Sequence, residues 1–199
     1  MIVLSIDCAG SGCGVCVWQD GRIVAVAREK MARGQDARLM PMIVDVMAQA
    51  GLDFAQIDRI AVTRGPGSFT GLRVGLAAAR GVGLAAGKPV IGIDRFAIYR
   101  AARAQGDVLV VIDSKRADLF CQFFPAAGTA DEPRLMTQKD IDIFAAAHPG
   151  VAIVGDIATP DIDEAALCAA LAVRAETGHA DFLPRPLYLR APDVTLPGA

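Results

Sequence analysis

The order of apolar and polar positions predicts three strands at the start of the chain. Residues 2–7, 15–18 and 23–27 are short, mainly apolar segments rich in Val and Ile. An Asp-Gly pair at residues 20–21 separates the second and third segments, and this pair is typical of a tight hairpin turn. We therefore expect an antiparallel meander.

Helical and extended patterns alternate after the meander. Apolar residues recur with helical spacing over residues 36–50, 70–86 and 94–105. Continuous apolar segments at residues 59–63 and 90–93 are typical of buried strands. The first half of the chain therefore combines a sheet with three helices.

The same order begins again in the second half. A strand pattern at residues 108–113 ends in Ile-Asp, as the first strand does. The patterns that follow predict a strand at 119–124, a helix at 138–147, a strand at 151–154 and a helix at 162–176. Two strands can end in Ile-Asp by coincidence, but the shared order of elements favours an internal duplication.

Two duplicated lobes, each with an aspartate at a strand end, are typical of the actin, chaperone and sugar-kinase superfamily. We therefore predict an α/β fold of the two-lobed actin-like (ASKHA) class, whose RNase H-like lobes form a duplicated mixed sheet flanked by helices. The lobes are expected at residues 1–105 and 106–199, with the option that the last residues return to the first lobe.

Charge and composition exclude some classes of function. The formal net charge is -2 and the pI is about 5.7, which argue against a basic surface over the whole chain. The first residues lack a basic leader and no segment stays apolar long enough to span a bilayer, so we expect a soluble cytoplasmic protein.

Five cysteines cannot all pair, and we expect them to be reduced. The Cys-x-x-Cys pair at 13–16 overlaps the strand predicted at 15–18 and lacks a second Cys pair or a nearby His, so a metal site there is not expected.

A glycine-rich turn lies between the fourth strand and the second helix. Its residues are Arg64, Gly65, Pro66, Gly67, Ser68, Phe69, Thr70 and Gly71. The hydroxyl of Ser68 or of Thr70 can cap the helix that follows, and exposed backbone amides at the start of that helix can attract anions. The spacing matches neither the P-loop nor the dinucleotide fingerprint, so we interpret it as a structural turn.

Residues 64–75 strongly resemble the signature of the bacterial TsaB family, also called YeaZ. Further similarity lies at residues 4–7, 39–43, 111–115 and 186–192, and it is weak between 125 and 185.

The resemblance implies a non-catalytic subunit that scaffolds and activates a larger paralogue, TsaD, together with a small ATPase, TsaE. That machinery places threonylcarbamoyl on the adenosine after the anticodon of tRNAs that read codons beginning with A. ATP and a metal are used by the partner subunits, and no tightly bound cofactor is expected in this chain. We expect a homodimer in the absence of the paralogue, indirect contact with tRNA or contact within the complex, and no membrane association.

The paralogue's metal is held partly by a His-x-x-x-His pair, for which this chain has no equivalent. The comparable residues 90–96 contain no histidine, and His148 and His179 are isolated. Two positions depart from the family pattern. Family members often have His where this chain has Asp36, and Thr where it has Cys8. A thiol is a poor substitute for a hydroxyl donor, which weakens a phosphate-binding role for the first turn.

The alternative function is an ATP-dependent, kinase-like enzyme of the same superfamily. Its nucleotide would be bound in the cleft by Asp7, Gly10, Ser11, Gly12 and Asp113. Such an enzyme needs a glycine-rich adenosine loop in the second lobe, where only the Gly-Asp pair at residues 155–156 is available.

Two helices have apolar faces that are wide for a single core. We predict that they form a helical bundle with the paralogue or with a second copy of this chain. The contact residues are expected to be Leu39, Met40, Ile43, Met47, Gly71, Arg73, Gly75 and Ala79. The alternative is that the small residues pack on this chain's own sheet and the methionines fill core gaps.

Overall fold

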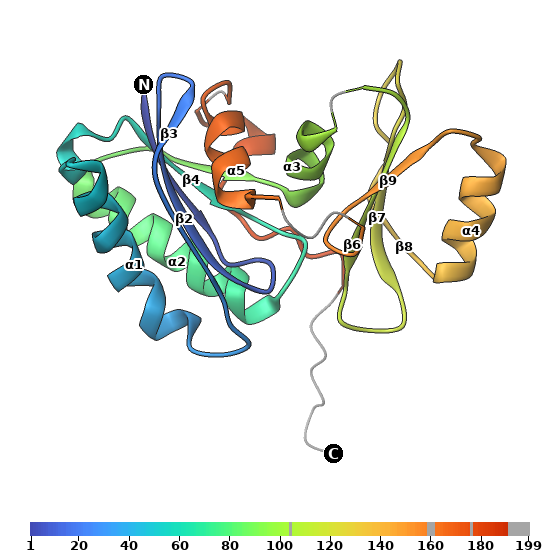
Figure 1. Ribbon diagram of the computed structural model, residues 1–199, viewed down its shortest axis with the longest axis horizontal. Coiled ribbons are helices and arrows are strands. Elements are labelled where there is room, and N and C mark those ends of the chain that lie inside the picture. The colour runs from blue at the N-terminus through green and yellow to red at the C-terminus, as the bar shows by residue number, and fades with distance from the viewer. Residues whose placement is uncertain (104, 159–161, 176, 191–199) are drawn as a thin grey trace.

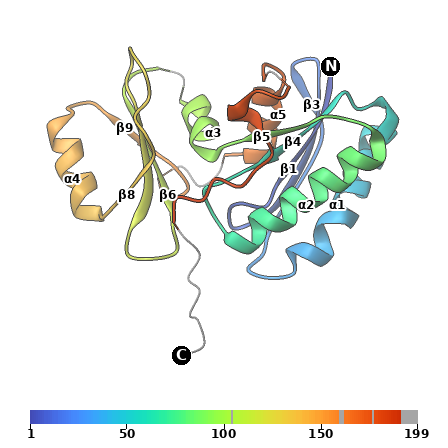
Figure 2. The same ribbon diagram turned by 180° about the vertical axis from the view of Figure 1, so that it is seen from behind.

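A computed structural model describes residues 1–103, 105–158, 162–175 and 177–190. It contains two sheets in two lobes, with one helix lying between them (Figures 1 and 2). The prediction of a two-lobed actin-like α/β fold is confirmed. No helix within the described ranges is long and apolar enough to cross a membrane.

The first sheet contains five strands in the order β3-β2-β1-β4-β5. Their bounds are β1 (Ile2–Asp7), β2 (Gly12–Gln19), β3 (Arg22–Lys30), β4 (Arg59–Thr63) and β5 (Val90–Ile93). The first three strands form the predicted antiparallel meander, and β4 and β5 continue the sheet in parallel with β1. Asp20 and Gly21 both have positive φ, as the predicted hairpin turn requires.

Helices cover both faces of this sheet. α1 (Gln35–Ala50) and α2 (Phe69–Ala86) lie on one face, where they pack on Leu4 and Ile6 of β1. α5 (Glu164–Ala172) lies on the other, against Val3. Successive side chains of a strand point to opposite faces, so β1 contributes to both cores.

The second sheet repeats the strand directions of the first. Its order is β8-β7-β6-β9, with β6 (Val108–Asp113), β7 (Leu119–Phe124), β8 (Arg134–Met136) and β9 (Ala152–Val154). β6 pairs antiparallel with β7 and parallel with β9, as β1 does with β2 and β4. α4 (Gln138–Ala147) covers the outer face (Figure 1). β8 was not predicted, because it is a strand of three residues in which only Met136 is buried.

α3 (Arg95–Ala102) lies between the lobes in both views of the ribbon. Its Ile98 packs into the core of the first lobe, whereas Phe96 and Tyr99 pack against the second sheet. The helix is shorter than predicted, because Arg103 leaves the helical backbone. Two short 3₁₀ helices, η1 (Phe54–Gln56) and η2 (Ala180–Phe182), complete the described secondary structure.

Residues 183–190 form a strap that contacts both lobes. The amide of Leu187 donates to the carbonyl oxygen of Arg64 at 2.7 Å in the first lobe. Arg190 forms an ion pair with Asp118 in the second. The strap and α5 both follow residue 105, yet both pack against the first lobe. Residues 191–199 of the predicted second lobe lie outside the described residues.

Candidate functional site

The glycine-rich turn fixes the start of α2 against the loop that joins β1 and β2. The hydroxyl of Ser68 accepts a hydrogen bond from the amide of Gly71, so the predicted helix cap is confirmed at Ser68. The amide of Ser68 donates to the carbonyl oxygen of Ala9 at 2.8 Å. A side chain at Gly71 would collide with the backbone of Cys8. The turn therefore brings two backbone segments into direct contact.

Asp7 is buried at the end of β1, on the first-lobe side of the cleft. Its carboxylate accepts hydrogen bonds from the hydroxyl of Thr63 at 2.5 Å and from the amide of Ala9 at 3.0 Å. Burial, followed by repulsion from Glu164, raises the pKa of Asp7 from 3.8 to about 6. This carboxylate is engaged by its own chain.

Asp113 ends β6 on the opposite side of the cleft. Its carboxylate accepts bonds from the amide of Lys115 at 2.6 Å and from the ammonium group of Lys115 at 2.7 Å. Partial burial opposes ionisation, but these contacts outweigh it and lower the pKa of Asp113. The amide of Asp113 donates to the carboxylate of Asp156 at 2.8 Å.

A buried arginine occupies the base of the cleft between these aspartates. Arg95 begins α3, and its side chain is only 1% exposed. Its guanidinium donates to both carboxylate oxygens of Glu164, at 2.5 and 2.7 Å, and to Asp156 at 3.3 Å. It also donates to the carbonyl oxygen of Pro66 at 3.2 Å. One side chain thus links the glycine-rich turn, α5 and the second lobe.

The hydroxyl of Tyr99 completes this network, which we call the Arg95 network: Arg95, Tyr99, Asp156 and Glu164. Tyr99 donates to Glu164 at 3.1 Å. Burial alone would raise the pKa of Glu164, but the attraction and hydrogen bonds of Arg95 outweigh it and lower that pKa. Both members of the pair are therefore charged, and each satisfies the other.

This arrangement bears on metal and nucleotide binding. Among the residues that the structure describes, no group of three or more His, Cys, Asp or Glu side chains is arranged to hold a metal ion. Glu164 and Asp156 are compensated by Arg95, and Asp7 by two internal donors. The sequence reasoning did not identify Arg95 or Glu164. The only available signal was the charged pair Asp94-Arg95 within the otherwise uncharged residues 90–99.

The predicted helix contacts need correction. The structure buries Leu39, Ile43, Met47, Gly71, Gly75 and Ala79 on the side of α1 and α2 that faces the sheet. In this chain they pack on its own sheet, and the glycines of α2 allow β4 and the end of β1 to approach closely. Of the predicted set, only Met40 and Arg73 are exposed.

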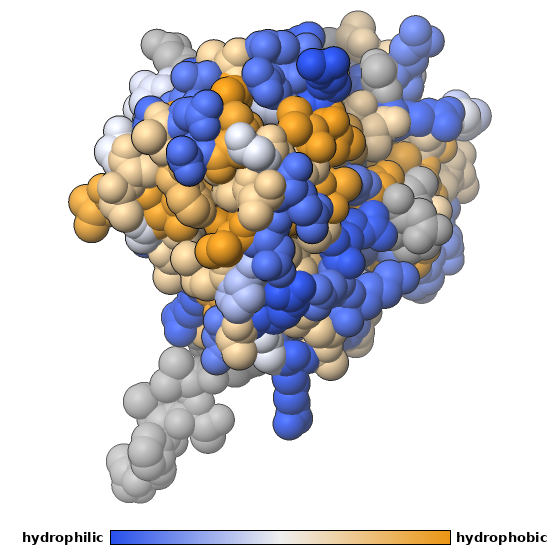
Figure 3. All heavy atoms as spheres, turned by 60° about the vertical axis from the view of Figure 1, so that its left-hand side comes forward, coloured by the Kyte–Doolittle hydropathy of each residue, from blue (hydrophilic) through white to orange (hydrophobic). Residues whose placement is uncertain are grey.

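Both helices nevertheless present apolar side chains to solvent. Met40 is 44% exposed, Val44 54% and Leu84 87%. Figure 3, in which the α1 and α2 side comes forward, shows apolar atoms gathered on this side. We call these three residues the outer helical patch.

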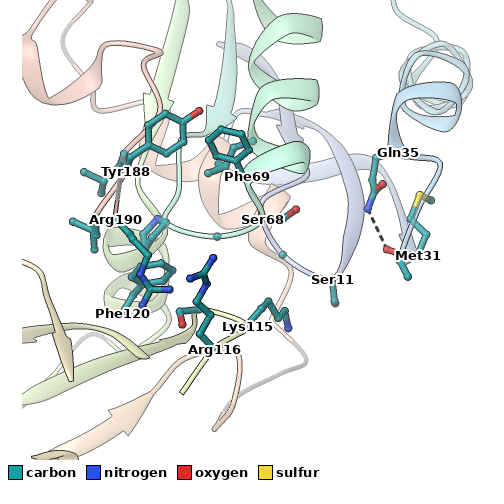
Figure 4. Close-up of a pocket in the computed structure, with 18 of the residues that line it drawn as sticks. Ser11, Met31, Gln35, Ser68, Phe69, Lys115, Arg116, Phe120, Tyr188 and Arg190 are labelled. Carbon is teal, nitrogen blue, oxygen red and sulfur yellow. Dashed lines mark hydrogen bonds between the residues drawn. The ribbon is translucent and has the colours of Figure 1, made fainter. Parts of the chain in front are cut away.

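A large cavity opens on the cleft side, between the lobes and the strap (Figure 4). Its volume is about 1030 Å³. The first lobe contributes Gly10, Ser11 and the turn around Ser68, and the second contributes residues 114–116 and 120. Asp7 lines a smaller cavity of about 200 Å³ instead.

Comparisons with known proteins agree with this architecture. The family described as TsaD, tRNA N6-adenosine threonylcarbamoyltransferase, matches residues 26–134. The tRNA threonylcarbamoyladenosine biosynthesis protein TsaB of Escherichia coli (strain K12) is 36% identical over 124 residues, which cover 60% of this chain and 53% of that protein. The match thus spans about half the length of that relative.

Two other proteins match over more of their length. An uncharacterised protein of Mycobacterium tuberculosis (strain H37Rv) is 32% identical over 170 residues, which cover 82% of this chain and 78% of that protein. The crystal structure of a Pseudomonas aeruginosa protein with similarity to peptidase YeaZ has a TM-score of 0.72 at 22% identity. It covers 95% of this chain and 99% of that one. Together with the residues of the glycine-rich turn, these matches show that the chain belongs to the TsaB (YeaZ) family.

Proposed function

We propose that this chain is a non-catalytic subunit of the machinery that forms threonylcarbamoyladenosine on tRNA in the cytoplasm. In this proposal it binds and activates a catalytic paralogue of the TsaD type, together with an ATPase of the TsaE type. The names of its relatives and the matched family support the pathway. ATP and the metal belong to the partner subunits.

The Arg95 network is the observation that carries the non-catalytic role. A metal-nucleotide site needs carboxylates that are free to face the ligand, and a cation there would compete with a fixed guanidinium. Removing Arg95 from between Glu164 and Asp156 would leave buried charges uncompensated, which costs several kcal/mol. This cost weakens the kinase-like alternative.

The outer helical patch supports a scaffolding role. Exposed apolar side chains on neighbouring helices are typical of surfaces that bind other proteins, and methionine adapts well to different partners. Met40 and Val44 are one helical turn apart on α1, so they lie on the same face. We propose that this patch forms the contact with the paralogue and, in its absence, with a second copy of the chain.

The proposed function is tested by measuring the modified nucleoside in cells. When the protein is depleted, we expect the threonylcarbamoyladenosine content of digested tRNA, measured by mass spectrometry, to fall. Expression of the intact chain should restore it, whereas the purified chain alone should transfer nothing. An unchanged content after depletion would exclude the proposal.

A separate titration tests the kinase-like alternative. Calorimetry of the isolated chain with magnesium ATP should show negligible heat. Tight binding would favour an enzyme.

A further inference from the structure

The large cavity on the cleft side has a positively charged lining. It is lined by Lys30, Lys115, Arg116 and Arg190. None of the described residues that line it is Asp or Glu, although Lys115 pairs with Asp113 and Arg190 with Asp118 just outside the lining. Figure 4 shows Arg116 extending toward the turn that carries Ser68, while Arg190 approaches from the strap. The chain as a whole has a net charge of -2, so these cations form a local site.

Two exposed aromatic rings lie at the edge of the same cavity. Phe69 is 40% exposed and Tyr188 39%, and their ring centroids are 5.3 Å apart. The guanidinium of Arg73 lies 3.8 Å from the centroid of Phe69 and donates to the hydroxyl of Tyr188 at 3.3 Å. Phe69 belongs to the glycine-rich turn, yet it adds little to the core. The pair is held in place by contacts but remains open to solvent.

The lining of the cavity matches the chemistry of an unpaired nucleotide. Its cations can bind phosphates, and its exposed rings can stack on a planar base. Phosphates bind to lysine and arginine, and bases stack on aromatic rings without strict sequence preference. The rings here lie at the edge of a concave site between two lobes. The cavity volume, about 1030 Å³, is at the upper end of the range for drug-sized ligands, roughly 300–1,000 Å³, which leaves room for a nucleotide.

We propose that this cavity binds an unpaired segment of RNA, with its phosphates on the basic residues and a base against Phe69 and Tyr188. The inference rests on the proposed function, because it gives the chain a direct contact with the tRNA substrate. It assigns a ligand to residues that neither the Arg95 network nor the outer helical patch uses.

Fluorescence anisotropy with a labelled RNA hairpin that has an unpaired loop tests the proposal on the full chain. Lys115→Glu and Arg116→Glu should each weaken binding at least about tenfold, and each lost phosphate contact should lower the salt dependence by about one in log–log slope. Lys139→Glu, which makes the same change of charge on α4, is the control and should bind like the parent.

Phe69→Ala separates stacking from charge. It should weaken binding roughly fivefold to hundredfold while leaving the salt dependence unchanged, because no cation is lost. An equal loss in Lys139→Glu would show that only overall charge matters and would overturn the site. Binding of adenosine monophosphate as tightly as the hairpin would assign the cavity to a free nucleotide instead. If the intact chain restores modified tRNA in cells but neither it nor its complex with the paralogue binds the hairpin through these residues, the inference fails and the proposed function stands.

A second observation, independent of the cavity, concerns two cysteines. Cys8 and Cys13 lie opposite each other where the β1–β2 ladder ends, and both are buried. Their sulfur atoms are 2.8 Å apart. Cys13 also lines the cavity of about 200 Å³, which gives a small oxidant a route to its sulfur.

The geometry points to Cys8 and Cys13 as a disulfide-forming pair that reacts with hydrogen peroxide. One thiolate attacks a peroxide oxygen, which gives a sulfenic acid and, after protonation, water. The second thiol then attacks the sulfenic sulfur, forms the S–S bond and releases a second water. Two thiols are oxidised and one peroxide is reduced, so atoms and electrons balance. The bond would fix the backbone on which Gly71 packs.

Mass spectrometry of the peroxide-treated protein tests this pair. The intact mass should fall by two hydrogens, digestion should yield a linked Cys8–Cys13 peptide, and a thiol reductant should reverse the change. Cys13→Ser should abolish the loss, whereas Cys121→Ser should keep it. A mass gain of oxygen atoms without the linked peptide, no change at all, or a link between other cysteines would overturn the assignment.

Discussion

Replacing Glu164 by Gln tests how strongly the Arg95 network stabilises the fold. The substitution keeps the shape of the side chain but leaves the guanidinium of Arg95 without its closest anion. Removing one partner of a buried ion pair costs about 3–5 kcal/mol. Asp156 stays within 3.3 Å and partly compensates, so we expect the lower value, about 3 kcal/mol. For a chain of this size that loss corresponds to a fall in Tm of roughly 6–12 °C.

Urea unfolding followed by circular dichroism measures this loss as a change of midpoint at constant slope. The matched control is Glu29→Gln, which breaks a half-exposed pair with Arg38 and should shift the midpoint far less. The double variant Arg95→Met, Glu164→Leu should recover much of the stability, because apolar groups can replace a buried pair. A loss below about 1 kcal/mol for Glu164→Gln, or an equal loss in the control, would refute the reasoning.

Three further predictions concern pH, packing and docking. Because its pKa rises from 3.8 to about 6, Asp7 binds more protons in the folded state between these values, so stability falls as pH rises through them. Asp7→Asn should remove this slope in denaturation across pH and add at most about 3 kcal/mol at pH 7. Gly71→Ala should lower the free energy of unfolding by about 1–3 kcal/mol, whereas Gly81→Ala, which meets nothing nearby in the same helix, should raise it by up to about 1 kcal/mol. Val44→Asp should abolish co-elution with the paralogue in size-exclusion chromatography, while Ile143→Asp, an equally exposed site on α4, should not. Co-elution of both variants at the parent's position would place the interface elsewhere.

Local patterns were sufficient to predict most of the elements. The hairpin at residues 20–21 and the cap at Ser68 each depend on a few adjacent residues. The types of these residues determine the local backbone conformation, so both features could be predicted. The repeated strand pattern predicted a duplicated mixed sheet, and the structure has two mixed sheets. The end of α3 and the short strand β8 were missed, because neither is marked by an apolar period.

The candidate site was harder to predict, because its contacts join distant parts of the chain. Arg95 meets Glu164 across 69 residues of sequence and Asp156 across 61. No local pattern distinguishes such an arginine from one on the surface. The helix contacts failed for a related reason: helical spacing defines a face, but it does not say which face packs on the sheet. Gly75, for example, lies against Cys8 rather than facing solvent.

The same long-range contacts limit where this protein can act. The Arg95 network joins the glycine-rich turn, α5 and the second lobe, and the strap joins the lobes a second time through Leu187 and Arg190. Opening the cleft would therefore break a buried ion network and the strap contacts together, which makes large lobe movements costly. The outer helical patch and the basic cavity need no such opening, because both are accessible in the closed arrangement. The outer helical patch lies on α1 and α2, whereas the basic cavity lies between the lobes and the strap, so in the proposed role a partner and an RNA segment would occupy separate surfaces.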